Sequence, residues 1–469
     1  MSDRGLELAR TKMTEAGVAP AAVETFSRFY RLLESGESGL VREADVEPLE
    51  DLPRHADLHV PAADATDALA RTAIIKLNGG LGTSMGMDRA KSLLTVRRTD
   101  AGQDLSFLDV IVRQVQAARA ATGARLPLVL MNSFRTQDDS LAALAKHDGV
   151  AVDGLPLDFL QNREPKLRAD DLEPVEWPAD PSLEWCPPGH GDLYPALHAS
   201  GLVQALLDAG FRYASVSNSD NLGAAPDAEI AAWFAASGAP YAAEMCLKTP
   251  ADVKGGQLVV RRSDGRIVQR ETAQTHPDDL DAALDPTVHR YFHTNNLWFD
   301  LEALAAELDR TGGVLELPLI RNDKTVDPTD PSSPEVVQIE SAMGAAVAVF
   351  EGATAIEVGR ERFLPVKKTS DLLLMRSDVY ELTGDYRLVA RASAPLVELS
   401  GTYKTISRFD ERFAAGAPSL RGASSLTVDG DWSFGAGVRV VGEGVLSDAG
   451  EPATVPDGAT VGPSGVATS

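Results

Sequence analysis

The stretch KLNGGLGTSMGMDRAKSLL, residues 76–94, sets closely spaced glycines between two lysines. Gly79, Gly80 and Gly82 let the backbone adopt conformations closed to other residues and let a ligand approach the main-chain amides. Those amides are fixed hydrogen-bond donors, and Lys91 adds a mobile positive charge. The combination indicates a phosphate-binding loop, with a tight strand-to-helix turn that binds no ligand as the alternative.

Two common phosphate-binding motifs do not match this loop. A P-loop requires a glycine directly before its lysine, and Ala90 stands there. The dinucleotide fingerprint, started at Gly80 or Gly82, lacks its third glycine. The spacing therefore predicts phosphate binding by a loop of another type.

The elements that must position this loop form a regular alternation. Short apolar runs at 72–77, 126–131 and 212–218 are separated by helical patterns such as 109–121. This alternation is typical of an α/β domain with a largely parallel sheet, whose ligands lie beyond the carboxyl ends of the strands. The glycine loop follows the first of these runs, and Asp220 follows the third.

The chain divides into four segments by pattern. Residues 1–70 read as a helical segment, because Val23, Phe26, Phe29, Tyr30 and Leu33 recur at spacings of three and four. Residues 71–380 form the α/β domain, and 381–419 read as a linker. Residues 420–469 mix glycines with apolar residues at short intervals, which predicts a β-helix-like domain, with a pair of hairpins as the alternative.

Composition excludes several function classes. The formal charge of -25 on 469 residues repels nucleic acids and anionic membranes. No apolar run approaches the roughly 18 residues of a membrane span, and the N-terminus lacks the apolar region of a signal peptide. We expect a soluble cytoplasmic protein. Cys186 and Cys246 are too few for a disulfide framework or a cysteine zinc site, so we expect both to pack in the interior.

The glycine loop and six later segments, in order, resemble the eukaryotic-type UTP:glucose-1-phosphate uridylyltransferases. These segments are PLVLMNSF (127–134), PPGHGDLY (187–194), VSNSDNLGA (216–224), ADVKGGQLV (251–259), TNNLW (294–298) and RFLPVKKTSDLLL (362–374). The resemblance implies a Rossmann-like nucleotide-sugar transferase domain with an N-terminal helical segment and a C-terminal left-handed β-helix. It also implies the reaction of UTP with glucose 1-phosphate to UDP-glucose and pyrophosphate, with Mg²⁺ as cofactor.

The resemblance assigns roles at the phosphates and at the base. Lys91 contacts the departing β- and γ-phosphates, Lys367 reaches the α-phosphate, and Lys368 beside it faces solvent. Asp220 is the Mg²⁺ ligand; from the residues alone, capping of the next helix is the alternative. The nucleotide is held by the following residues: Leu77, Asn78, Gly79, Gly80, Met131, Gln161 and Gly189. A glutamine amide can flip to pair with uracil or cytosine, so a fixed backbone N–H at Gly189 must complete base choice.

His190, Asn218 and Asn296 match contacts to the sugar phosphate, with Gly256 and Glu271 as weaker candidates for sugar hydroxyls. Two positions depart from the family pattern: Ser219 replaces an apolar residue and His293 replaces an asparagine. They leave open another hexose 1-phosphate, such as galactose or N-acetylglucosamine 1-phosphate. A non-catalytic sugar-nucleotide-binding regulator is a further alternative, opposed by the joint presence of Lys91, Asp220 and Lys367. The C-terminal domain either joins copies into a homo-oligomer or caps the catalytic domain.

Overall fold

A seven-stranded sheet forms the centre of the molecule in the computed structural model, which describes residues 3–37, 39–99, 102–249, 252 and 255–467. β14 runs antiparallel to both neighbours, and the other adjacent strands are parallel. The predicted α/β domain is confirmed. In sheet order the strands are β17 (Thr354–Glu357), β11 (Tyr241–Leu247), β14 (Tyr291–Asp300), β10 (Tyr213–Asn218), β2 (Thr72–Asn78), β5 (Leu128–Asn132) and β6 (Asp158–Leu160).

The central strand β2 supplies apolar side chains to both faces of the sheet. Ile74 joins one hydrophobic cluster, whereas Ala73 and Ile75 join the other. Successive side chains of a strand point to opposite faces, so a strand covered on both faces reads as a continuous apolar run. This explains why residues 72–77 show no polar alternation.

Helices cover both faces of the sheet. The first cluster takes in α3 (Ala62–Ala70), α4 (Phe107–Thr122), α8 (Ala228–Ser237) and α11 (Thr369–Arg376), and α5 (Gln137–Leu144) packs beside α4. The second takes in α1 (Asp3–Glu15), α2 (Pro20–Glu34), α6 (Leu193–Ser200), α7 (Leu202–Asp208) and α10 (Leu301–Thr311). α9 (Leu280–Leu284) is a short helix that follows β13 in the chain.

Local sequence explains where these helices begin. α4 starts with a capping box, in which the Ser106 side chain accepts from the Asp109 amide and the Asp109 carboxylate accepts from the Ser106 amide. α2 starts with Pro20 in its first turn, where a missing N–H costs nothing. Its buried face contains Val23, Phe26 and Phe29, as the spacing predicts.

The N-terminal segment is not purely helical. Strand β1 (Val46–Pro48) pairs with β12, and α3 packs against α8 of the α/β domain. Smaller sheets extend this domain: β1 with β12 (Gly256–Arg261) and β13 (Ile267–Glu271); β8 (Leu167–Arg168) with β16 (Glu335–Glu340) and β15 (Ile320–Thr325); and the pairs β3 (Thr95–Arg98) with β4 (Asp104–Ser106), β7 (Glu164–Pro165) with β9 (Trp185–Cys186), and β18 (Tyr380–Leu382) with β19 (Leu388–Ala390).

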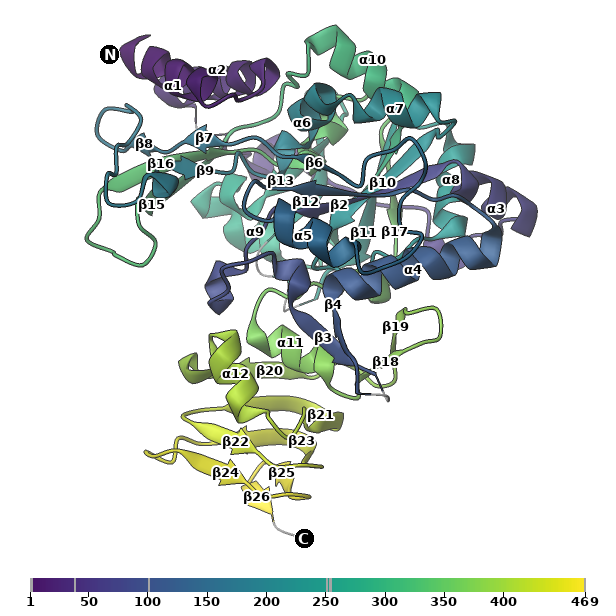
Figure 1. Ribbon diagram of the computed structural model, residues 1–469, viewed down its shortest axis with the longest axis vertical. Helices are drawn as coiled ribbons and strands as arrows, with labels where there is room; N and C mark the ends of the chain where they lie inside the picture. The colour runs from purple at the N-terminus through teal and green to yellow at the C-terminus, as the bar shows by residue number, and fades with distance from the viewer. Residues whose placement is uncertain (1–2, 38, 100–101, 250–251, 253–254, 468–469) are drawn as a thin grey trace.

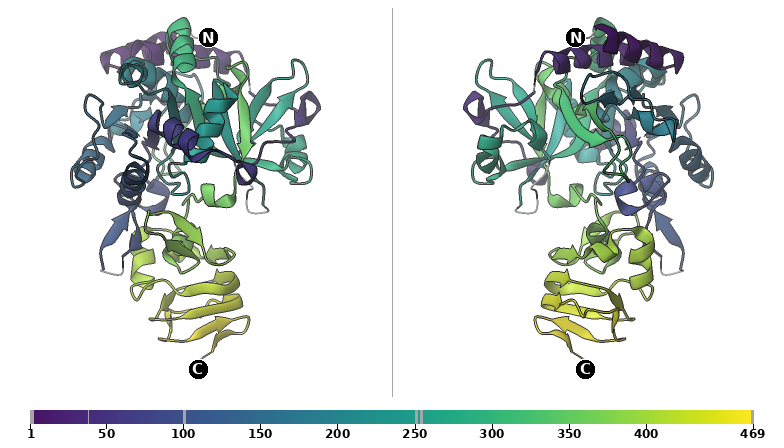
Figure 2. Two further views of the ribbon diagram at one scale, coloured as in Figure 1. Left: turned by 90° about the vertical axis from the view of Figure 1, so that its right-hand side faces the viewer. Right: turned by 90° about the vertical axis from the view of Figure 1, so that its left-hand side faces the viewer.

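The C-terminal strands extend away from the α/β domain (Figures 1 and 2). β20 (Leu396–Leu399), β21 (Ser419–Val428), β23 (Arg439–Leu446) and β25 (Thr460–Gly462) pair in parallel, and β26 (Gly465–Ala467) closes the sheet antiparallel. β22 (Trp432–Phe434) and β24 (Ala453–Val455) form a second parallel pair. Parallel pairing of successive strands rules out the pair of hairpins, since hairpin strands are antiparallel.

Residues 381–419, read from the sequence as a linker, carry regular structure. β19, β20 and α12 (Ile406–Arg412) lie there, and β20 is a member of the C-terminal sheet. Its strands are difficult to predict from the sequence, because they are only three or four residues long and polar residues separate them. The C-terminal sheet therefore begins near residue 396, before the predicted boundary at 420.

Two further expectations concern single features. Within the described ranges, no helix combines the length and apolar character needed to cross a membrane. Cys186 and Cys246 are both buried and unpaired, which confirms their packing role.

Candidate functional site

The glycine loop leaves the carboxyl end of β2 and folds back on itself. Gly82 and Gly86 adopt left-handed conformations, with φ of 64° and 73°, and the Lys91 amide donates to the Gly80 carbonyl at 3.0 Å. Two 3-10 turns, Thr83–Met85 and Lys91–Leu93, follow. The loop does not lead directly into a helix, because β3 and β4 precede α4, and phosphate binding by the loop stays a prediction.

Lys91 and Asp220 meet although 129 residues separate them, with Lys91 Nζ 2.6 Å from Asp220 Oδ2. Parallel pairing of β2 with β10 brings their loops to one edge of the sheet, where Leu77 lies opposite Asn218. The side chains of Lys91 and Asp220 remain 16% and 21% exposed, so a ligand can still reach them. This pair is the centre of the candidate site.

Asp220 is not the cap of the following helix. α8 is capped by Asp227, whose carboxylate accepts from the amides of Glu229 and Ile230. The Asp220 carbonyl instead accepts from Val366 N–H at 3.3 Å, which places the LPVKK segment directly beside it. The helix-cap alternative for Asp220 is therefore wrong.

Lys367 and Lys368 both have exposed side chains. Their amides donate to the Asp371 carboxylate, which fixes the backbone at the start of α11. Lys367 lies near Glu271, since its positive charge opposes the burial that raises the pKa of Glu271. Lys367 thus stands between Asp220 and the predicted sugar contacts.

A Mg²⁺ ion would find one carboxylate here. Among the described residues, no group of three His, Cys, Asp or Glu side chains is arranged to hold a metal. Asp220 also shares Oδ2 with Lys91. Mg²⁺ commonly binds through one or two carboxylates plus substrate phosphates and water, so Asp220 fits as a ligand for an ion that arrives with a nucleotide.

The predicted base-reading residues converge beside the glycine loop. A Cβ on Gly79 would lie 2.4 Å from Gln161 Oε1, so only glycine lets Gln161 approach this closely. The backbone N–H of Gln161 donates to the backbone carbonyl of Asn132 at 2.8 Å. Met131 differs from these residues, because it lies on β5 and its side chain is buried in the second hydrophobic cluster.

The PPGHGD loop is held by residue 341 and by Asp192. The Gly191 amide donates to the Ser341 carbonyl at 2.8 Å, and Gly189 has a φ of 77°. The Asp192 carboxylate accepts from Asn162, both from its backbone N–H at 2.5 Å and from Nδ2 at 2.9 Å. Asp192 thereby joins the His190 loop to the loop that carries Gln161.

The predicted sugar contacts differ in their burial and in the hydrogen bonds that they make within the protein. His190 Nδ1 accepts from the Met343 amide at 2.9 Å, so Nε2 carries the proton, and burial lowers its pKa to about 4. Asn218 is half-buried at the end of β10. Asn296 is buried, and both hydrogens of its amide are used, donated to Glu244 and to the Arg362 carbonyl. Its side-chain oxygen accepts from Asn221 Nδ2 at 3.1 Å, so every polar group of the Asn296 side chain has a partner within the protein.

A buried set of charges behind the site was missed by the sequence analysis. Arg362 donates to Glu244 through Nε at 3.0 Å and Nη2 at 2.6 Å, and Trp298 donates to the same carboxylate. Lys76 Nζ donates to Ser217 Oγ and the Ala224 carbonyl, both at 2.7 Å. The available signal is a charged residue inside an apolar strand, as in TAIIKL and YAAEMCL.

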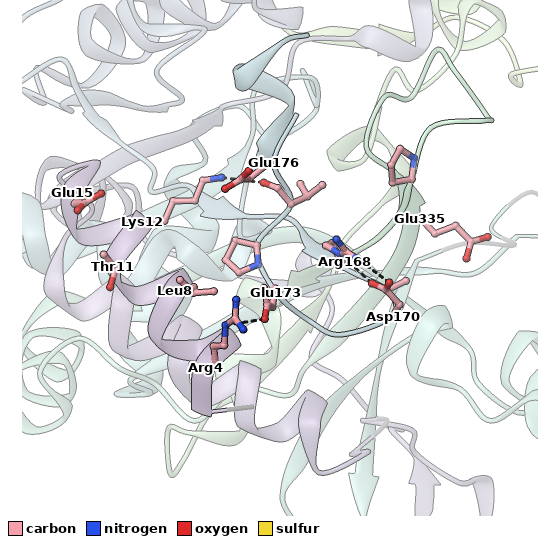
Figure 3. Close-up of a pocket in the computed structure, with 14 residues that line it drawn as sticks. Arg4, Leu8, Thr11, Lys12, Glu15, Arg168, Asp170, Glu173, Glu176 and Glu335 are labelled. Carbon is pink, nitrogen blue, oxygen red and sulfur yellow. Dashed lines mark hydrogen bonds and ion pairs between the residues drawn. The ribbon is translucent and has the colours of Figure 1, made fainter. Parts of the chain in front are cut away.

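A wide groove lies away from the Lys91–Asp220 pair. A volume of about 1110 Å³ opens between α1 and the region of β8, lined by side chains such as Arg4, Lys12, Arg168 and Glu335 (Figure 3). None of the residues that line it is a predicted site residue. We therefore place the candidate site at the Lys91–Asp220 pair, on the evidence of side-chain geometry.

The fold and site define an α/β protein with a lysine–aspartate pair and a glycine loop at one edge of its sheet, and comparison with known proteins gives its family. The family model described as UTP--glucose-1-phosphate uridylyltransferase matches residues 23–440. The enzyme of that name from Solanum tuberosum is 38% identical over 413 residues, covering 87% of this chain and 83% of that protein. The one from Saccharomyces cerevisiae is 38% identical over 396 residues, covering 83% and 77%. The chain belongs to the UTP--glucose-1-phosphate uridylyltransferase family.

Comparison with solved structures supports the same family. A variant of UDP-glucose pyrophosphorylase from Leishmania major, crystallised with UDP-glucose, superposes with a TM-score of 0.90 at 38% identity. The match covers 98% of both chains. A Trypanosoma brucei structure has a TM-score of 0.89 at 39% identity, with 98% of this chain and 99% of that one covered.

Proposed function

We propose that this chain transfers a uridylyl group from UTP to glucose 1-phosphate, releasing pyrophosphate and forming UDP-glucose in the cytoplasm. The observation that carries the proposal is the Lys91–Asp220 contact of 2.6 Å at the end of the glycine loop, in a chain of this family. The pair offers a cation for phosphate oxygens and a carboxylate for a metal at one point of the sheet edge.

The reaction is an in-line substitution at phosphorus. A phosphate oxygen of the sugar forms a bond to the α-phosphorus of UTP, and the bond from that phosphorus to the pyrophosphate oxygen breaks. Because both reactants are anions, the protein must screen charge and align them, and no covalent enzyme intermediate is needed. Lys91 would pair with the departing pyrophosphate, and Lys367 with the α-phosphate.

Asp220 would hold Mg²⁺, which supplies charge neutralisation at the phosphates when bound. Lys91 Nζ donates to one oxygen of that carboxylate at 2.6 Å. Lys91 would therefore hold the Asp220 side chain in place beside the phosphates.

The remaining contacts follow the chain around the site. Gln161 and the Gly189 backbone would read uracil, and the backbone of residues 77–80 and of Met131 would border the nucleotide. His190 Nε2 and Asn218 would face the sugar phosphate, and Asn296 would border it with a side-chain oxygen that also accepts from Asn221. We further propose a Rossmann-like catalytic domain and a left-handed β-helix at the C-terminus, which is available for contacts between copies.

Pyrophosphate release from UTP, measured with a panel of hexose 1-phosphates, tests the function. We expect glucose 1-phosphate to give the highest kcat/KM and to need added Mg²⁺. A preference for galactose or N-acetylglucosamine 1-phosphate would replace the sugar assignment. Tight binding of UDP-glucose without turnover of any sugar phosphate would show a regulator, and the proposal of an enzyme would fail.

A further inference from the structure

Two buried polar atoms beside the candidate site lack partners. Gln269 Oε1, on β13, and His293 Nε2, on β14, make no hydrogen bond with any residue in the described part of the chain. The two residues are only 3% and 2% exposed. Buried polar atoms in folded proteins are nearly always paired, so two unpaired ones close together require an explanation.

The chemical character of both atoms is set by their neighbours. Gln269 Nε2 donates to Glu271 Oε1, which fixes the amide so that Oε1 is the free acceptor. The Asn295 amide donates to His293 Nδ1 at 3.0 Å, so the ring proton lies on Nε2, a free donor. Burial and the nearby His190 lower the pKa of His293 to about 4, which keeps this donor neutral near pH 7.

Glycines bring the two atoms to one place. A Cβ on Gly344 would lie 2.2 Å from Gln269 Oε1 and 3.0 Å from His293 Cε1. A Cβ on Gly256 would lie 2.6 Å from Gln269 Nε2 and 2.7 Å from Glu271 Oε1. Side chains at either glycine would fill the space that the pair needs.

The place is next to residues assigned to the sugar phosphate. His293 is close enough to His190 for the charge of one to affect the other, and Glu271 stands in the same relation to Lys367. Gln269 lies between Glu271 and Gly344. The unpaired donor and acceptor therefore lie at the sugar end of the site.

We propose that Gln269 and His293 form a pair that recognises one hydroxyl group of the hexose. A hydroxyl both donates and accepts, so it would donate to Gln269 Oε1 and accept from His293 Nε2–H. Both atoms are buried, so an incoming sugar must part Gln269 from Gly344 to reach them. This inference rests on the proposed function and names two residues that select its sugar.

The test uses glucose 1-phosphates modified at one carbon each, as deoxy and as fluoro compounds at C2, C3, C4 and C6. A fluorine accepts weakly and cannot donate, so it leaves Gln269 Oε1 unpaired. At one carbon we expect both analogues to lower kcat/KM by about a hundredfold or more, because a site built for a hydroxyl rejects its absence.

Two variants assign that loss to the pair. Gln269→Leu and His293→Phe should each reduce the discrimination at that carbon to about tenfold or less, since the atom left unpaired is then gone. His59→Asn, at an exposed histidine between the turn 55–57 and α3, is the control and should keep the full discrimination.

The same ratio is measured as Kd of UDP-glucose and its deoxy analogues by calorimetry. If both variants keep every discrimination ratio, in rate and in Kd, the pair is structural or holds only water, and the inference is overturned. If no sugar phosphate is turned over but the Kd ratio depends on the pair, the recognition stands and the proposed function fails. Absence of both turnover and binding overturns both.

Discussion

At the residue scale, the charge of Lys91 is the feature on which turnover should depend most. Lys91→Met keeps most of the side-chain volume and removes the cation that would meet pyrophosphate. We expect kcat to fall about a hundredfold or more, the usual result of losing one contact made in the transition state. Steady-state pyrophosphate release measures it, with Lys368→Met, at the exposed neighbour of Lys367, as the control. Equal rates for the two variants would contradict a role for Lys91.

Asp192 is a second residue with a measurable consequence. Burial raises the pKa of the Asp192 carboxyl to about 7, although the two hydrogen bonds from Asn162 act to lower it. The folded protein then binds a proton that the unfolded chain releases near pH 4, so this group favours folding at low pH and loses that contribution as pH rises to about 7.

Asp192→Asn removes this pH dependence. Relative to the parent, the variant should be more stable at pH 8 than at pH 5 by on the order of 2 kcal/mol, because the folded carboxyl keeps its proton up to about pH 7 whereas the unfolded one has already lost it. Chemical unfolding of both proteins at the two pH values measures the difference. A stability difference that is the same at pH 5 and pH 8 would show that Asp192 is ionised throughout.

At the scale of elements, Lys76 ties strand β2 to the loop that follows β10. Its amino group donates to Ser217 and to the Ala224 carbonyl, on either side of Asp220, and burial lowers its pKa to about 7. Lys76→Met should leave both acceptors unpaired and cost about 1–3 kcal/mol of unfolding free energy.

The same variant should loosen the Asp220 loop. We therefore expect the Mg²⁺ concentration for half-maximal rate to rise several-fold, measured by metal titration of turnover. If Lys76→Met loses this much stability but its Mg²⁺ dependence is unchanged, Lys76 has only a structural role. Leu108→Ala, in the buried face of α4, is a suitable comparison because it destabilises the core without contacting the loop.

Strands β11 and β14 and the segment before α11 are joined by Glu244. The carboxylate is fully buried and accepts from Arg362, Asn296 and Trp298. Glu244→Gln keeps the shape but removes the hydrogen-bonded counter-charge of Arg362, whose other carboxylate neighbour, Asp227, lies 3.9 Å away. Breaking a buried pair typically costs about 3–5 kcal/mol, and we expect a loss of that size in chemical unfolding. A change below about 1 kcal/mol would show that Asp227 and solvent compensate.

At the scale of the whole molecule, the α/β domain and the C-terminal strands share one hydrophobic cluster. It runs from Ile74 through Leu372 to Leu426 and Val461. A chain ending at residue 393, before β20, should expose this cluster and aggregate, as judged by size-exclusion chromatography and near-UV circular dichroism. Removal of residues 463–469 alone, which takes only β26, should leave a soluble, folded chain. A folded, monodisperse 1–393 fragment would show that the α/β domain is independent.

Much of this architecture is readable from local sequence. The apolar runs before Lys76 and Asn218 match β2 and β10, and the spacing of Val23, Phe26 and Phe29 matches the buried face of α2. Periodicity reports which face of an element is buried, and glycine reports where the backbone must bend, so both survive in a single sequence.

The site itself depends on which strands are neighbours. Sheet order β10-β2-β5 and the parallel register bring Lys91 to Asp220, and the same packing makes Asp227, seven positions later, the helix cap. The sequence does not distinguish the roles of the two aspartates, because both lie in the loop between β10 and α8. The sequence alone determined the main apolar strands, the buried face of α2 and the glycine-rich loop, because these depend on near neighbours along the chain. Only the tertiary structure decided the Asp220 contact, the extent of the C-terminal sheet and the unpaired Gln269–His293 pair, because those depend on contacts between distant segments.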